Sequence, residues 1–566
     1  MAWHTKNGEF YGLGRYPARS CLKYEKLQQF HRLGSRHAAA RVRAGTWDRT
    51  ILAVRQVVHV TLRATLLVAC LLAAGCAMEG RHAAATASSA QPPEEEAAGI
   101  RQAQTLVGTA RWVQADALLK GLLARPDFAR LEPTEQHTLV SLAALAALQN
   151  RDAPRALALS RRACASPAGD ARDWFTRLRA ANSVPEPTDA ILALTILAER
   201  WPQVLARLPD YEPIVQVMGN DLQAGASDAQ RYELLAALHK IKFLDEPRGS
   251  GEWWREFALL QLARGERLSA VQTLARITDP YVIISIEADR RFDAIRGEPG
   301  ALAAVPEAAE ESVQAELRYA QLSPERLEPM NQLAEILINC SRLQQALSVT
   351  DAAIEQQDEH GGSAWSDYET QYEWILINRA NALFSLGRYQ AALAQMEAAS
   401  RLHEQPAANV SATINLADMY NQLGETQRAA DTLQRVSAAD VTPYGRMQLE
   451  IEKLSVALAR HDEPAGSRAL DYLRAHRDDA ISTYQEALLA AGRDAEGAAL
   501  LIARLREPRL RSDALLAVQV YAVDAQPAAV LQERARWHAL VNRVDVQQAI
   551  SSVGRVARYP LLMVNY

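Results

Sequence analysis

The stretch INLADMYNQLGETQRAADTLQRV, Ile414–Val436, carries the pattern on which the fold depends. Its small and apolar residues recur every three or four positions on both sides of Gly424, which predicts two helices joined by a turn at the glycine. Ala417 and Ala429 stand where the two helices of such a pair would cross, because closely approaching axes leave room only for small side chains. The larger apolar residues would then fill the space to a neighbouring pair.

The same arrangement occurs in three more units. They read INRANALFSLGRYQAALAQMEAA, NQLAEILINCSRLQQALSVTDAA and WWREFALLQLARGERLSAVQTLARI, at Ile377–Ala399, Asn331–Ala353 and Trp253–Ile277. In all four units the two crossing alanines are 12 residues apart. Ser341 takes the place of the turn glycine in one of them. Weaker copies of the pattern lie at 110–123, 148–163 and 490–505, so most of the chain is expected to repeat one helix pair.

These units resemble the tetratricopeptide repeat (TPR), in which antiparallel helix pairs stack one on the next. The turns at Gly387 and Gly424 are 37 residues apart, near the roughly 34-residue period of that family. The resemblance implies an all-α, right-handed superhelical solenoid of antiparallel helix pairs. It also implies a binding protein without a cofactor, in which the first helix of each pair lines a concave face. Sustained alternation of apolar and polar residues is absent from the sequence, so strands should be few.

Composition shifts and Pro/Gly punctuation divide the chain into five expected regions. The segment DPYVIISIEADRRFDAIRGEPG breaks the repeat pattern and is expected to separate two helical arrays. The regions are an N-terminal extension with a signal segment at 1–75, a flexible tether at 76–97, degenerate helical repeats at 98–300, TPR-like repeats at 305–440 and C-terminal helical repeats at 441–566.

The run LLVACLLAAGCAMEG, Leu66–Gly80, raises a separate question of processing. The uncharged stretch around it is shorter than the roughly 20 residues of a membrane-spanning helix and fits the apolar core of a secretory signal. Small residues before Cys76 resemble the bacterial lipobox, whose cysteine thiol takes a diacylglyceryl group before the chain is cut in front of it. The resemblance implies lipidation of Cys76 and attachment to a membrane through N-terminal acyl chains. Ala77 follows the cysteine, and in the lipoproteins this resembles a residue other than Asp there permits export to the outer membrane.

A signal that begins near residue 60 leads us to expect that translation starts downstream of Met1, with Val60 as a candidate.

The whole chain carries a formal charge of −5, and residues 1–75 carry +9 by count, which leaves −14 for the remainder. Nucleic-acid binding needs a basic face, so an acidic chain is a poor candidate for that function.

We find no motif that indicates catalysis or a metal site. The sequence lacks H-E-x-x-H, G-x-S-x-G, a Gly-rich phosphate loop and Cys-x-x-Cys, and its histidines are scattered singly. The expected protein is therefore not an enzyme. Binding is expected instead on the first helices, where the TPR resemblance points to a partner-binding groove of amides, a hydroxyl and carboxylates at Asn331, Glu335, Asn339, Asn381, Ser385, Asp418 and Gln422.

The leading hypothesis is a lipid-anchored periplasmic scaffold, held at the outer membrane, that binds other envelope proteins or peptides. The alternative is a cytosolic or inner-membrane TPR adaptor that keeps its N-terminus. The apolar end of the chain, YPLLMVNY at Tyr559–Tyr566, could pack on the last helices or on a partner, and the sequence does not separate these.

Overall fold

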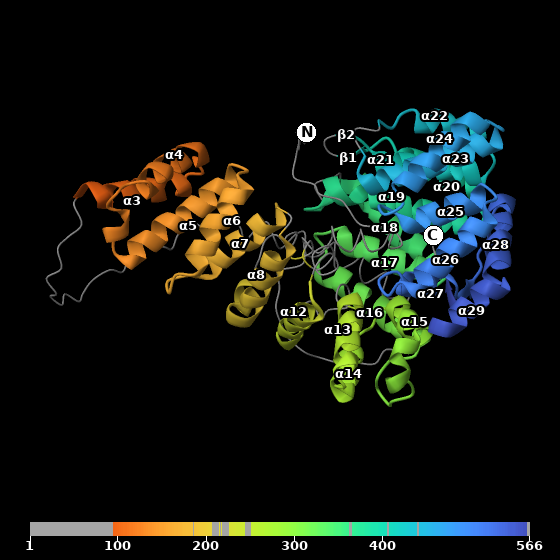
Figure 1. Ribbon diagram of the computed structural model, residues 1–566. Coiled ribbons are helices and arrows are strands. Elements are labelled where there is room, and N and C mark those ends of the chain that lie inside the picture. The colour runs from red at the N-terminus through yellow and green to blue at the C-terminus, as the bar shows by residue number, and fades with distance from the viewer. Residues whose placement is uncertain are drawn as a thin grey trace. The chain divides into compact units, whose positions relative to one another are not determined.

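A computed structural model describes residues 94–562, apart from 185, 206–213, 215–216, 218–225, 244–250, 361–364, 405–406 and 438–440. The expected signal segment, Cys76 and most of the expected tether lie outside the described residues. The described residues form two compact units, one ending at 243 and one beginning at 251. Figure 1 shows that each unit consists of stacked helices.

The unit that ends at residue 243 is a series of helices, each packed on its neighbours in sequence. Helix α3 begins inside the expected tether. The helices are α3 (Glu94–Gly108), α4 (Trp112–Leu123), η3 (Phe128–Arg130), α5 (Pro133–Gln149), α6 (Ala153–Cys164), α7 (Ala171–Asn182), α8 (Pro187–Arg200), α9 (Pro202–Leu205) and α12 (Asp228–Lys240).

The unit that begins at residue 251 contains the four strongest sequence repeats. Its elements are α13 (Gly251–Ala263), α14 (Arg267–Leu274), α15 (Pro280–Ala288), η5 (Arg290–Ile295), α16 (Val305–Leu322), α17 (Glu328–Asn339), α18 (Leu343–His360), α19 (Tyr368–Ser385), α20 (Tyr389–Ala399), β1 (His403–Glu404), β2 (Ala407–Ala408), α21 (Val410–Gln422), α22 (Thr426–Leu433), α23 (Pro443–Ala459), α24 (Glu463–Ala475), α25 (Ile481–Ala490), α26 (Asp494–Arg506), α27 (Arg511–Ala517), β3 (Val520–Ala522), α28 (Ala528–Val541), α29 (Val544–Val553) and β4 (Arg558–Leu562).

One turn geometry recurs where a helix ends and the chain reverses. At Gly424 the backbone is left-handed, with φ 75°, and its N–H donates to the carbonyl of Asn421 at 3.0 Å. The N–H of the next residue donates to the carbonyl of Tyr420 at 2.8 Å, which completes a Schellman motif. The same positive φ and the same pair of hydrogen bonds occur at Ala110, Arg151, Lys242, Gly265, Ser341, Gly387, His461 and Gly492.

The predicted crossing positions lie at the helix–helix contacts. All of them are completely buried, with 0% exposure: Ala258, Ala270, Ala334, Ala346, Ala380, Ala392, Ala417 and Ala429. Each pair packs on the following one, as α18 does on α19 and α20 on α21, and the first helices α17 and α19 also meet directly. The helices are thus paired and stacked as in TPR solenoids, and the prediction of an all-α repeat fold is confirmed.

Strands are few among the described residues, as predicted. The strands β1 and β2 form a short antiparallel pair, and β3 and β4 form a parallel pair. The break expected near residue 300 falls within the second unit, where α15 and α16 pack together. No helix of the described residues is both long enough and apolar enough to cross a membrane.

We predict that Ala380→Leu destabilises this unit by about 1–3 kcal/mol, because the extra side-chain atoms overpack the contact between α19 and α20. Chemical denaturation followed by circular dichroism measures the change. Ala391→Leu is the matched control, since Ala391 lies in the paired helix α20 but is exposed to solvent. Equal stability of the two variants would contradict the assigned crossing position.

Candidate binding groove

The seven polar residues predicted to line a groove come from the first helices α17, α19 and α21, but they differ in exposure. Asn331 has no exposed surface and Asn339 is 4% exposed. The other five, Glu335, Asn381, Ser385, Asp418 and Gln422, are partly exposed. A partner would therefore reach these five residues and not Asn331.

Asn331 instead connects neighbouring first helices. Its side-chain amide donates to the backbone carbonyl of Gln371 in α19 at 2.8 Å. In return, the side-chain amide of Asn378 donates to the backbone carbonyl of Asn331 at 3.2 Å. A buried amide of this kind needs hydrogen-bond partners, so Asn331 contributes to the spacing of α17 and α19.

Similar hydrogen bonds from side-chain amides join the first helices of later pairs. The amide of Asn421 in α21 donates to the carboxylate of Glu452 in α23 at 2.7 Å. The amide of Gln448 in α23 donates to the hydroxyl of Thr483 in α25 at 3.1 Å. Part of the amide-rich character seen in the sequence therefore serves contacts between repeats.

The partly exposed end of the row carries negative charge. Gln422 donates to the carboxylate of Asp418 at 2.8 Å within α21. Helix α28 lies against α21 and α25 and brings Glu533 near Asp418 and Glu486. Loss of water around its carboxylate and the charges of Asp418 and Glu486 raise the pKa of Glu533 to about 7, although the residue as a whole keeps exposed surface. This end of the face would favour a neutral or basic partner segment.

The chain's own C-terminal segment covers the other end of the row. The N–H of Ala525, which follows β3, donates to the carbonyl of Ser385 at 3.2 Å. The hydroxyl of Tyr281 in α15 donates to the carbonyl of Leu562 at 2.6 Å and lies 3.4 Å from that of Asn339. Two predicted groove residues, Ser385 and Asn339, thus already have neighbours from distant parts of the chain.

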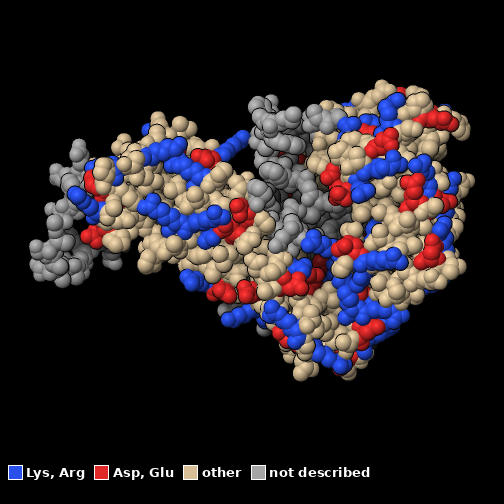
Figure 2. Space-filling model, in the orientation of Figure 1, with Lys and Arg blue, Asp and Glu red and all other residues tan. Residues whose placement is uncertain are grey.

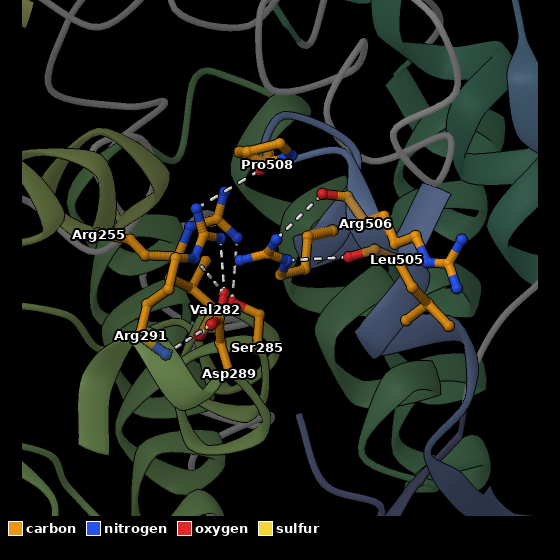
Figure 3. Close-up of polar contacts among 9 residues, drawn as sticks. Arg255, Val282, Ser285, Asp289, Arg291, Leu505, Arg506 and Pro508 are labelled. Atoms are coloured by element: carbon orange, nitrogen blue, oxygen red, sulfur yellow. Dashed lines mark hydrogen bonds and ion pairs between the residues drawn. The ribbon is translucent and has the colours of Figure 1, made fainter. Parts of the chain in front are cut away.

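Helix α15 packs on α27, and η5 is hydrogen-bonded to the segment after α26. Asp289 is 1% exposed, and its carboxylate accepts from the Nε and a terminal nitrogen of Arg291 at 2.8 and 2.6 Å. Arg291 also reaches the carbonyl of Pro508, after α26, at 3.5 Å. Arg255 of α13 donates to the hydroxyl of Ser285 beside this group (Figure 3).

Arg511 supports the same junction from the other side. Its side chain donates to the carbonyls of Leu505 and Arg506 at 2.9 and 3.1 Å, which satisfies free carbonyls at the end of α26. Burial and the nearby Arg291 guanidinium lower the pKa of Arg511. The junction therefore gathers several guanidinium groups, whose hydrogen bonds go both to backbone carbonyls and to the side chains of Asp289 and Ser285 (Figure 3).

Gly554 allows the closest approach in this junction. It forms an isolated antiparallel bridge with Asp289, and the next N–H, from Arg555, donates to the carbonyl of Ala288 at 2.9 Å. A Cβ at residue 554 would lie 2.3 Å from Leu515 Cδ2 and 2.8 Å from the carbonyl oxygen of Ala288. Only glycine fits without displacement of its neighbours.

Neither the charges on the visible face nor the metal-ligating side chains of the described residues mark a second site. Acidic and basic side chains are interspersed over the visible face of the unit beginning at 251 (Figure 2). Within the described part of the chain, no group of three or more His, Cys, Asp or Glu side chains is placed to hold a metal ion.

The contact between α15 and the C-terminal segment was not predicted from the sequence. Both segments stood out as apolar interruptions of the repeat, but neither contains a residue that points to the other. Trp253 and Trp254, which begin one of the repeats, are 5% and 0% exposed and belong to the core.

Comparisons with known proteins give structural similarity only. No family model matches the chain, and no curated protein matches it. The Rap protein complexed with competence and sporulation factor is 14% identical, with a TM-score of 0.31 over 72% of this chain and 99% of its own. Yeast Tom70 is 10% identical, with a TM-score of 0.28 over 81% and 99%. Cut9, from the APC/C hetero-tetramer Cut9–Hcn1, is 13% identical, with a TM-score of 0.23 over 80% and 89%. Since these scores are below 0.5, the description of the fold depends on the helix packing of this chain itself.

We predict that Gly554→Ala lowers the free energy of unfolding of the unit beginning at 251 by about 1–3 kcal/mol, because the new Cβ overlaps Leu515 and a backbone carbonyl. Denaturant titration measures the loss. Gly466→Ala, whose Cβ would make an ordinary 3.8 Å contact with Ala457, is the control and should not destabilise. An unchanged midpoint for Gly554→Ala would show that the junction is not tightly packed in solution.

Proposed function

We propose that this protein is a lipid-anchored periplasmic TPR-like scaffold that binds other proteins of a bacterial cell envelope. The observation that carries the binding part is the row of partly exposed polar side chains on successive first helices. Glu335, Asn381 and Asp418 recur at the same place in three stacked pairs, each six residues before the left-handed turn, and with Gln422 they keep accessible surface. Hydrogen-bonding groups held at regular spacing on a rigid array suit an extended segment of a partner protein.

Location and anchoring are supported by sequence alone. Cys76 ends an apolar run with small residues before it, and AMEGRHAAATASSAQPP follows, up to the start of α3. This small, polar, Pro-containing stretch suits a flexible connection between a membrane anchor and a folded domain. Ala77 after the cysteine favours the periplasmic face of the outer membrane over retention in the inner one.

Attachment is tested by Cys76→Ala. Without the acylated thiol we expect the protein to leave the membrane fraction or to accumulate as uncleaved precursor, because stable anchoring requires more than one acyl chain. Fractionation and mass spectrometry of the N-terminus measure both effects. A variant that stays membrane-bound and correctly cleaved would refute lipidation, and an intact Leu66–Gly80 segment in the native protein would favour the cytosolic or inner-membrane adaptor.

The same fractionation tests the assigned membrane. The native protein should sediment with outer-membrane markers on a density gradient, and Ala77→Asp should move it toward inner-membrane markers. Recovery of the native protein mainly with inner-membrane markers would overturn the outer-membrane assignment while leaving lipidation intact.

Partner binding is tested by Asn381→Arg. A long charged side chain on the first helix α19 should reduce capture of envelope proteins at least several-fold in pull-downs from detergent-solubilised envelopes. Gln390→Arg is the matched control, because it makes the same change at an exposed position of the second helix α20 in the same pair. If both variants capture the same proteins as the native chain, the first-helix face is not the binding surface.

A further inference from the structure

The strand β4 is an extended segment that buries three of its five side chains in the protein. Its exposure alternates along Arg558–Leu562: Arg558 and Pro560 are exposed, whereas Tyr559, Leu561 and Leu562 are 8%, 3% and 2% exposed. Alternation of this kind is typical of a strand that lies on a surface and inserts every second residue. Leu562 departs from this alternation, because it is buried directly after the buried Leu561.

Two side chains of α15 hold the ends of β4. The hydroxyl of Tyr559 donates to the carboxylate of Glu287 at 3.0 Å. At the other end, Tyr281 donates to the carbonyl of Leu562 at 2.6 Å. Burial, together with the Glu287 carboxylate, raises the pKa of Tyr559, so its hydroxyl stays protonated as a donor.

Leu562 completes a hydrophobic cluster that the helix pairs otherwise build. That cluster is built from buried apolar residues of α16 to α23, including Leu337, Leu383 and Leu416. Helix α17 and β4 are in direct contact. Leu562 thus extends this cluster at α17, from a segment outside the repeats.

The backbone pairing of β4 is weak. Its parallel partner β3 has three residues against its five, and the register shifts between Val520 and Ala522. Pro560 has no N–H to donate to such a ladder. A two-stranded parallel sheet is rarely stable alone, so β4 is held chiefly by its side chains and by Tyr281.

The junction next to β4 does not depend on it. Gly554 and Arg555 bind Ala288 and Asp289 before the strand begins. Between them and β4, Val556 and Ala557 are exposed. Ala557 is itself hydrogen-bonded to Gln519 and Val520, so the strand can leave its place beyond Ala557 while the contacts of Gly554 and Arg555 remain.

We propose that β4 is an exchangeable occupant of a peptide site, and that a partner protein binds by inserting an extended segment of the same chemistry in its place. The site consists of β3, Tyr281, Glu287 and the apolar cluster beside α17 that Leu562 joins. It accepts a hydroxyl-bearing aromatic residue followed, two and three positions later, by two aliphatic residues. This proposal rests on the proposed function, because it names the kind of segment that the scaffold takes and the chain's own competitor for it.

The test removes the occupant and offers it back in trans. A chain ending at Ala557 is mixed with a fluorescent peptide of sequence RYPLLMVNY, corresponding to residues 558–566, and anisotropy is recorded. The shortened chain should bind the peptide at least tenfold more tightly than the full chain, whose site is filled. A peptide with Leu561→Asp and Leu562→Asp should not bind, because charged side chains cannot enter the apolar cluster.

A second version of the protein keeps the test decisive if the shortened chain does not fold. A protease site placed at the exposed Val556 allows the full chain to fold first and to be cut afterwards. The labelled peptide should then replace the cut fragment over time. The proposal is overturned if neither form captures the peptide, if the full uncut chain binds it equally well, or if the aspartate-containing peptide binds as tightly.

These outcomes are separable from failure of the proposed function. Loss of envelope-protein capture in Asn381→Arg and loss of membrane attachment in Cys76→Ala are measured without the peptide. Absence of peptide exchange with both of those results intact would remove the strand-exchange site alone.

Discussion

The hydrogen bond that runs from the residue after each left-handed turn back to the carbonyl five positions earlier is the contact on which the rest of this structure depends. It ends one helix and sends the chain back along it, as from Glu425 to Tyr420 at 2.8 Å. Once the direction is set, alanines 12 residues apart face each other across the pair and the larger residues point to the next pair. Stacking then follows from burial of the apolar faces that one pair cannot cover alone.

Much of this arrangement could be predicted from sequence because it is local. The glycines at 387 and 424 adopt positive φ without steric cost, and the buried alanines stand at fixed distances from them. The turns at Arg151 and His461 carry no such signal, since a side chain there tolerates the left-handed region only because the surrounding pair requires it. Packing around these turns, and not their residue type, decides their conformation.

The candidate site was less predictable, for two physical reasons. First, an exposed amide and an amide that joins two helices look the same in a sequence, so the buried role of Asn331 is visible only from its bonds to Gln371 and Asn378. Second, the contact between Tyr281 and Leu562 joins residues 281 positions apart, and no periodicity extends over such a distance. The apolar end of the chain was recognisable as a docking segment, but its receptor was not.

The contact between Tyr281 and Leu562 has a consequence for the order in which this unit folds during synthesis. Helix pairs form from neighbouring residues and can fold while the chain is still being synthesised, whereas the place of Leu562 can be filled only after the codons for β4 are read. At about 5–20 residues per second, roughly 15–60 s separate the synthesis of Tyr281 from that of Leu562. For most of this interval β3, which belongs to the receptor, is missing as well. The helix pairs therefore keep exposed the apolar surface that Leu562 later covers, until residues 558–562 have been made.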